Sequence, residues 1–157
     1  MKAVKIGLLG FGTVGTGVVR LLTEQQEMLT RRLGTELVLA KIADLDLERP
    51  RPVTVPRELL TTRAQDLLDD PEIDIVVELI GGLSAARDFT LAAIARGKHV
   101  VTANKALLAH HGNDLLAAAA AQGVDIAFEA WSAAASPSSW PCARAWPPIA
   151  SRSSSAS

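Results

Sequence analysis

The glycine-rich segment Gly10–Gly15 constrains the possible folds of this chain more than any other feature. It has the pattern Gly-x-Gly-x-x-Gly, and it follows the apolar run Val4–Leu9, which we predict to be a buried strand. A helical pattern begins directly after it. In this context Gly10 permits a tight turn, Gly12 leaves room for a bound phosphate, and Gly15 allows the helix to pack closely on the strand.

A strand, a glycine-rich turn and a helix in this order indicate a dinucleotide-binding site. The reason is that the N-terminus of the helix attracts the charge of a pyrophosphate. An ordinary glycine turn is the alternative that the motif alone leaves open. If the site exists, the expected contacts include the three glycines and the residues between them, Phe11, Thr13 and Val14.

Strand and helix patterns alternate along residues 1–130. The predicted strands are Val4–Leu9, Glu36–Ala43, Asp74–Ile80, His99–Thr102 and Val124–Phe128. The predicted helices run from Gly12 to about Arg32, from Asp66 to Leu68, from Ser84 to Arg96 and from Asn113 to Gln122. Short connections between alternating strands and helices favour an α/β fold, a Rossmann-type doubly wound parallel sheet with an irregular C-terminal tail.

Several residues mark the expected ends and faces of these helices. Gly34 is predicted to end the first helix and Gly97 a later one, which Ser84 is predicted to cap. His110 and His111 are expected near the start of the last helix, as surface or capping residues rather than metal ligands. The buried face of the first helix is predicted to carry Val14, Val18, Leu21 and Leu22.

Asp44 closes the second predicted strand, where an acidic side chain can bind the adenosine ribose hydroxyls. A turn-forming aspartate in a polar loop is the equally plain alternative. Arg49 and Arg51 follow closely and could accept a 2′-phosphate, so these residues leave the choice between NAD and NADP open.

Two further strand ends carry candidate site residues. Ile80 and Gly81 belong to a turn after the third strand, at the sheet edge where ligands bind in open α/β sheets. Glu78 in that strand is interpreted as a structural carboxylate rather than a site residue. After the fourth strand come Thr102 and Lys105, and a lysine there could protonate a developing alkoxide, although most lysines are solvated surface groups.

Composition narrows the function classes. The net charge of −1 does not suggest nucleic acid or an anionic membrane as a partner. The glycines that interrupt the N-terminal apolar run argue against a signal peptide, and no apolar run is long enough for a membrane span. Cys142 is the only cysteine, which fits a cytoplasmic protein, and no Cys/His spacing suggests zinc.

Four runs in this order resemble homoserine dehydrogenase: KIGLLGFGTVGTGVV, DIVVELIGG, GKHVVTANKALLA and VDIAFEA. They cover most of residues 1–130, and VVTANKALLA is the most specific, because generic dinucleotide-binding domains do not share it. The resemblance implies NAD(P)-dependent interconversion of L-aspartate 4-semialdehyde and L-homoserine, towards threonine, methionine and isoleucine. It implies small-molecule substrates and a homo-oligomeric complete enzyme.

The resemblance also implies roles for individual residues. The glycine loop would cradle the pyrophosphate, and Gly81 would flank the nicotinamide ribose. Thr102 and Lys105 would line the active cleft, with Lys105 assisting proton transfer at the substrate oxygen. Glu129 matches a family residue next to a monovalent-cation site. The family often has an arginine before the aspartate of the second strand, where this chain has Ala43, which weakens the case for NADPH.

Residues 131–157 differ in kind from residues 1–130. All three tryptophans lie there, whereas no lysine, aspartate or glutamate does. If the codons are GC-rich, they can be chosen so that regrouping them one base earlier gives family-like stretches, and on this basis we hypothesise a frameshift near Ala130 or Trp131. A genuine disordered tail is the alternative. On either account we expect the 157-residue chain to lack the substrate and dimerisation domain. We therefore expect little or no dehydrogenase activity from this chain.

Two rival functions remain at this stage. One is a stand-alone dinucleotide-binding module without catalysis. The other is a different amino-acid dehydrogenase that shares the glycine loop, against which the TANKALLA run argues.

Overall fold

A computed structural model describes residues 3–128 of the chain. Its strands are β1 (Val4–Leu9), β2 (Leu37–Ala43), β3 (Leu60–Thr61), β4 (Ile75–Glu78), β5 (His99–Thr102) and β6 (Ile126–Phe128). Its helices are α1 (Thr13–Glu24), α2 (Gln26–Leu33), α3 (Ala64–Leu68), α4 (Ser84–Ala95) and α5 (Lys105–Gln122), with a 3₁₀ turn, η1, at Arg57–Leu59. The predicted α/β class is confirmed.

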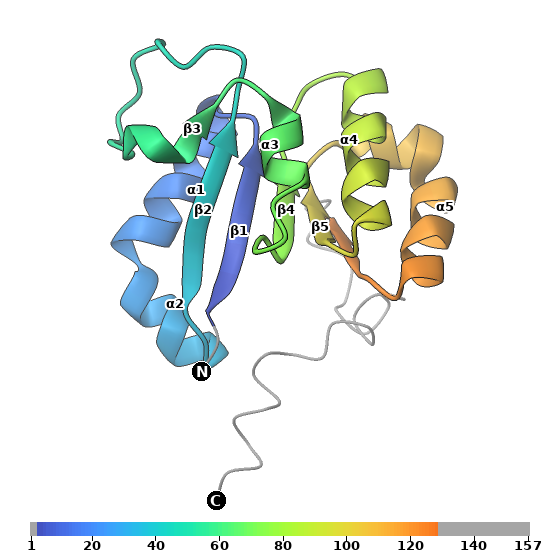
Figure 1. Cartoon of the computed structure of the whole chain (residues 1–157), viewed down its shortest axis with the longest axis horizontal. Coiled ribbons are helices and arrows are strands. Elements are labelled where there is room, and N and C mark those ends of the chain that lie inside the picture. Colours follow the sequence, from blue (N-terminus) through green and yellow to red (C-terminus); the bar gives the residue numbers. More distant parts are fainter. Residues whose placement is uncertain (1–2, 129–157) are drawn as a thin grey trace, which may run out of the picture.

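The strands form one sheet in the order β3-β2-β1-β4-β5-β6, and all neighbouring strands are parallel. The chain moves outward from β1 in one direction and then returns to add β4 on the other side. Helices α1 and α2 lie on one side of the sheet, and α4 and α5 lie on the other (Figure 1). In such a doubly wound sheet, ligands bind at the carboxyl ends of the strands, where the order reverses between β1 and β4.

The alternation of side chains along β1 builds a core on each face of the sheet. Ile6 and Leu8 face α1, where they join separate apolar clusters with Leu22 and Val19. Leu9 points to the opposite face and packs in the largest cluster. A strand buried on both faces is a continuous apolar run, and this explains why Val4–Leu9 was predictable.

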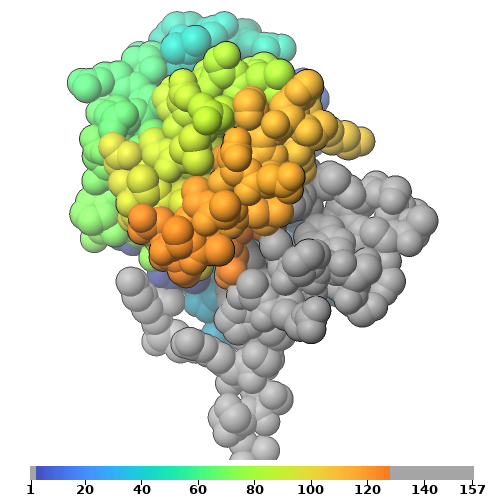
Figure 2. Space-filling model, turned by 90° about the vertical axis from the view of Figure 1, so that its right-hand side faces the viewer, coloured from blue at the N-terminus to red at the C-terminus, as the bar shows by residue number. Residues whose placement is uncertain are grey.

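Helices α4 and α5 pack together over the second face (Figure 2). Ala93 and Ile94 of α4 are buried with Leu107 and Leu115 of α5 in the largest cluster. The glycine at position 97 has φ 74° and ends α4 as expected. Strand β5 follows within two residues, so the end of the helix sets where that strand begins.

The first predicted helix is wrong in two respects. It is divided at Gln25 into α1 and α2, and α2 has no buried residue that would hold it in line with α1. Two residues expected on the buried face are instead exposed, Val14 at 54% and Leu21 at 44%. Leu22 is buried as predicted and Val18 is half-buried. The close approach of Gly15 to the Gly10 carbonyl group turns the helix so that Thr16 and Val19 are buried with Leu22.

The last helix begins at Lys105, not at Asn113 as predicted. Asn104 is its N-cap, and its side-chain oxygen accepts a hydrogen bond from the backbone N–H of Leu107 at 3.0 Å. His110 and His111 therefore lie within the helix rather than at its start. Asparagine is among the strongest N-cap residues, so this boundary was open to prediction from sequence.

Smaller differences concern α4, β3 and the tail. Leu83 is the N-cap of α4, and Ser84, the expected cap, is the first helical residue. The two-residue strand β3 was not predicted, because so short an edge strand has no alternation of its own. Gly34 ends α2 in the left-handed conformation, with φ 71°, as expected for the end of the longer predicted helix. The predictions for residues 131–157 lie outside the described residues.

Candidate functional site

A cavity of about 440 Å³ opens at the carboxyl ends of β1, β2 and β4, at the reversal of strand order. Five residues predicted from the sequence as cofactor contacts are among those that line it, namely Gly10, Gly12, Asp44, Ile80 and Gly81. The remaining lining residues are mostly apolar and include Leu45, Ala64 and Phe89. The structure thus gathers residues that are up to 71 positions apart in the sequence around one space.

The three glycines of the motif differ in whether the fold tolerates a side chain at their positions. Gly10 has φ 103°, a left-handed conformation that favours glycine. A Cβ at Gly15 would overlap the carbonyl oxygen of Gly10, so the helix and loop could not approach as they do. Gly12 differs from both, because a Cβ there would meet no described atom within 4 Å. The fold therefore requires Gly10 and Gly15, whereas the space next to Gly12 is open.

Gly12 is also the N-cap of α1, and it provides no side-chain cap. The first turn of this helix contains no acidic residue. Backbone N–H groups in the first turn of a helix have no partner within the helix, and they carry a partial positive charge. The loop therefore offers an anion both hydrogen-bond donors and space to approach them.

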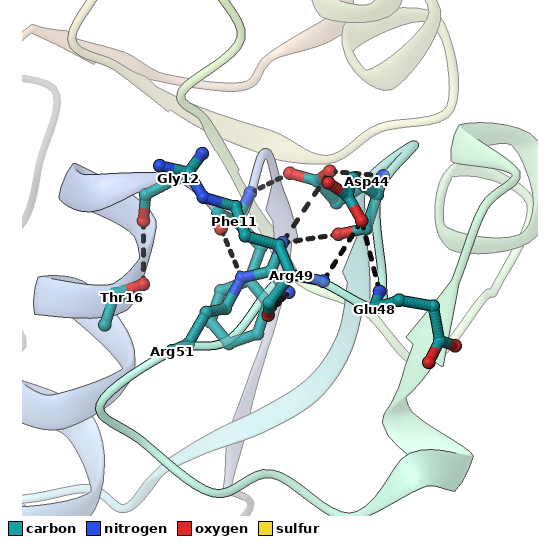
Figure 3. Close-up of polar contacts among 8 residues, drawn as sticks. Phe11, Gly12, Thr16, Asp44, Glu48, Arg49 and Arg51 are labelled. Atoms are coloured by element: carbon teal, nitrogen blue, oxygen red, sulfur yellow. Dashed lines mark hydrogen bonds and ion pairs between the residues drawn. The ribbon is translucent and has the colours of Figure 1, made fainter.

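Asp44 fastens the glycine loop to the end of β2 (Figure 3). Its Oδ2 accepts a hydrogen bond from the backbone N–H of Phe11 at 2.5 Å, and its Oδ1 accepts one from the N–H of Asp46 at 2.8 Å. The side chain is 21% exposed. An ionised carboxylate has about four acceptor positions, so Asp44 keeps acceptor capacity for a ligand hydroxyl.

Arg51 holds the same loop from the other direction (Figure 3). Its Nε donates to the carbonyl oxygen of Phe11 at 2.6 Å, and its guanidinium carbon lies 4.2 Å from the centre of the Phe11 ring. Its Nη1 and Nη2 donate to the carbonyl oxygens of Arg49 and Asp46, at 3.0 and 2.5 Å. The arginine is therefore a clamp between the glycine loop and residues 46–51.

The ends of β4 and β5 are joined by a buried carboxylate. Glu78 is fully buried, and its Oε2 accepts a hydrogen bond from the hydroxyl of Thr102 at 2.5 Å. Its Oε1 accepts one from the backbone N–H of Ile80 at 2.7 Å. Burial raises the pKa of the Glu78 carboxyl above its usual value, while these two hydrogen bonds act in the opposite direction. The interpretation of Glu78 as a structural residue agrees with this geometry.

Asn104 connects this buried pair to the cavity wall. The Thr102 hydroxyl accepts a hydrogen bond from the backbone N–H of Asn104 at 3.1 Å. The Asn104 amide donates to the carbonyl oxygens of Ile80 and Gly82, at 3.3 and 2.7 Å. The turn that follows β4 is thereby held in place by a residue from the next strand-to-helix connection.

The other predicted site residues that the structure describes do not line this cavity. Thr102 is fully buried behind the turn after β4, so its hydroxyl supports the site from within. Lys105 is exposed at the first position of α5, at the same edge of the sheet. Thr13 and Val14 are exposed in the first turn of α1, and Phe11 is buried under Arg51.

Sequence reasoning missed the structural roles of Asn104 and Arg51. For Asn104 the signal was present, since it stands between a strand and a helix at an N-cap position. For Arg51 there was no local signal, because its partner Phe11 is 40 residues away in the sequence. Glu129, the predicted neighbour of a monovalent cation, lies outside the described residues.

The part of the chain that the structure describes contains neither a metal-binding cluster nor a membrane-spanning helix. Within residues 3–128, no three His, Cys, Asp or Glu side chains come together in a way that could hold a metal ion. None of the helices in this range combines the length and apolar character needed to cross a membrane.

Comparisons with known proteins place this geometry among relatives. A family model described as "Homoserine dehydrogenase, NAD binding domain" matches residues 10–129. Homoserine dehydrogenase of Corynebacterium glutamicum is 51% identical over 136 residues, which are 87% of this chain and 30% of that protein. Homoserine dehydrogenase of Bacillus subtilis is 46% identical over 130 residues, which are 83% and 30% of the two chains.

A crystal structure of a homoserine dehydrogenase from Thiobacillus denitrificans superposes with a TM-score of 0.74 at 49% identity. The superposition covers 82% of this chain and 30% of that chain. The chain therefore spans about 30% of the length of the relatives it matches.

Proposed function

Because this chain belongs to the homoserine dehydrogenase family, we propose that the cavity at the carboxyl ends of β1, β2 and β4 is its NAD(P) site. The observation that carries the proposal is the open space at Gly12, at the N-terminus of α1 and on the wall of this cavity. A glycine that the fold itself does not require, at this position, is what close approach of a pyrophosphate requires.

We place the parts of the dinucleotide by the chemistry of the cavity wall. The pyrophosphate lies against the backbone of Gly12 and the first turn of α1. The adenosine ribose lies at Asp44, whose carboxylate can accept its hydroxyl protons. The nicotinamide ribose lies at Ile80 and Gly81. The apolar wall, which includes Leu45 and Phe89, excludes water from the flat faces of the ligand.

We propose that the complete enzyme interconverts L-aspartate 4-semialdehyde and L-homoserine, with the nicotinamide supplying or accepting the hydride. Lys105, exposed at the edge where β5 ends, would give or take the proton at the substrate oxygen. Thr102 and Asn104 would hold in place the turn after β4, which lines the proposed cofactor cavity. Glu129 would adjoin a monovalent cation, and the complete enzyme would be a homo-oligomer.

The 157 residues alone are expected to bind the dinucleotide without turning over substrate. The matched relatives are about three times as long, and the substrate contacts of the complete enzyme would come from that additional length. Measurable homoserine oxidation by the purified chain would contradict this expectation.

Calorimetric titration with NAD⁺ of Gly12→Ala and Gly17→Ala tests the proposal. Neither added Cβ would meet a described atom within 4 Å, so both variants keep the fold. Only position 12 lies on the cavity wall. We expect Gly12→Ala to weaken NAD⁺ binding by at least about tenfold, equivalent to about 1.4 kcal/mol, and Gly17→Ala to leave it unchanged. Equal binding by both variants would remove Gly12 from the site.

A further inference from the structure

Helix α1 has an apolar flank that the described part of the chain leaves largely uncovered. Val14, Val18 and Leu21 follow one another at helical spacing, yet Val14 and Leu21 are 54% and 44% exposed and Val18 is half-buried. On the opposite flank, Thr16 and Thr23 line hollows together with β2 or the segment that follows it. The apolar flank therefore faces away from β2, toward the β4 side of the sheet.

The sheet on that side carries a row of apolar side chains. The strand register aligns Leu8 of β1 with Val77 of β4, Val77 with Val101 of β5, and Val101 with Ala127 of β6. The residue before each of the last three belongs to the largest cluster, under α4 and α5, so the row points to the α1 face. Leu8 is buried with Val19 of α1, whereas Val77, Val101 and Ala127 are only half-buried.

This row lies beside the helix layer rather than under it. Within residues 3–128, α1 and α2 make their main sheet contacts with β2. The helices that pack mainly against β4, β5 and β6 are α4 and α5, which lie on the other face (Figure 1). The flank and the row together form what we call the apolar shelf, with a wall of Val14, Val18 and Leu21 and a floor of Val77, Val101 and Ala127. Covering apolar surface of this kind stabilises a protein.

The described chain ends at the edge of the shelf. Phe128, the last described residue, ends β6 and directly follows Ala127 of the floor. From β6 to β1 the floor spans three strand spacings, about 14 Å, a distance that about five extended residues cover. Residues 129–157 are therefore much longer than the shelf is wide.

The composition of residues 129–157 suits an apolar surface. They contain all three tryptophans of the chain, and their only charged residues are Glu129, Arg144 and Arg152. Tryptophan is among the side chains that bury the most apolar surface. Because burial of apolar surface is non-directional, this match does not depend on how the sequence of residues 131–157 arose.

We infer that residues 129–157 turn back from β6 and dock on the apolar shelf, with their tryptophans against its floor and wall. Their attachment at Phe128 gives them an effective concentration at the shelf on the order of millimolar, an advantage that a second copy of the chain lacks. The docking is independent of the proposed function, because no residue of the shelf lines the cofactor cavity.

Tryptophan fluorescence of the whole chain tests the docking, because residues 1–130 contain no tryptophan. Tryptophan emits at shorter wavelength in apolar surroundings than in water. We expect the folded chain to emit at shorter wavelength than the same chain unfolded in urea, and equally so at every protein concentration. Emission at the unfolded wavelength from a chain that circular dichroism shows to be folded would overturn the inference. A wavelength difference that disappears on dilution, together with a dimer in sedimentation, would also overturn it, because the occupant would then be a second copy.

Leu21→Lys places a charge on the wall of the shelf, and Met28→Lys is its matched control. The two side chains are similarly exposed, 44% and 43%, so both variants should fold, which far-UV circular dichroism checks. Met28 lies on α2, outside the shelf. We expect Leu21→Lys to shift the emission toward that of the unfolded chain and Met28→Lys to leave it at the wild-type wavelength. Unchanged emission from Leu21→Lys, or an equal shift in both variants, would show that the segment does not lie on the shelf.

Discussion

Replacing Thr102 by valine would test the buried network that supports the cavity wall. Valine matches the shape of threonine but lacks the hydroxyl, so two hydrogen bonds are lost together. One of them, from Thr102 to Glu78, serves a carboxylate with 0% exposure. Losing a hydrogen bond to a buried charged group costs about 1.5–3 kcal/mol and a neutral one about 1 kcal/mol. We expect Thr102→Val to lower the free energy of unfolding by about 2–4 kcal/mol.

Thr90→Val is the matched control. Thr90 is also fully buried, and within the described residues its hydroxyl has no hydrogen-bond partner. The same chemical change there removes a buried hydroxyl that makes no bond, so we expect no loss of stability. Urea unfolding followed by far-UV circular dichroism measures both. A loss for Thr102→Val no larger than that for Thr90→Val would refute the reasoning.

The pH dependence of this loss provides a second check. The hydroxyl of Thr102 stabilises the ionised form of Glu78, so removing it raises the pKa of that carboxyl further. The penalty of Thr102→Val is then largest at pH values where wild-type Glu78 is ionised, and it shrinks as acid protonates the carboxyl. A penalty that grows on acidification would contradict this assignment.

Three further changes test other parts of the fold. Gly15→Ala should prevent stable folding, measured by circular dichroism, because its Cβ would overlap the Gly10 carbonyl oxygen, whereas Gly17→Ala should fold normally. Lys98→Met should cost about 1–3 kcal/mol in urea unfolding, because the buried ammonium donates to two backbone carbonyl oxygens, at 2.5 and 3.0 Å. Glu78→Gln should flatten the pH dependence of stability: with a raised folded-state pKa, the contribution of Glu78 is complete below the unfolded pKa and is lost as pH rises through the folded pKa. A wild-type stability that does not fall relative to Glu78→Gln across that window would contradict the sign.

The fold was largely predictable because its strands are short apolar runs that end at glycine or polar turns. Val4–Leu9 was located without error, and the strand at His99–Thr102 likewise. The buried face of α1 was not predicted correctly, because it depends on how closely Gly15 approaches the end of β1. That approach is a tertiary contact, which the local sequence does not indicate. The start of α5 was missed although Asn104 is a strong N-cap residue.

In the candidate site, too, local sequence pattern predicted some contacts and gave no indication of others. Gly10, Gly12 and Asp44 were predicted as cofactor contacts from local pattern, and the structure brings them to one cavity. Arg51 was expected as a candidate for the 2′-phosphate, yet it is bound to the backbone of Phe11 and Asp46. No local pattern indicates such a clamp, because its energy comes from contacts between loops that are distant in sequence.

Backbone amide chemical shifts during titration of the chain with NAD⁺ test the central claim most directly. The account predicts that the largest shifts occur at the glycine loop, at Asp44 and Leu45, and at the turn that contains Ile80 and Gly81. The amides that line the surface beyond β3 should hardly move. Saturable binding with its largest shifts beyond β3, or no shifts at the glycine loop of the folded chain, would contradict the account.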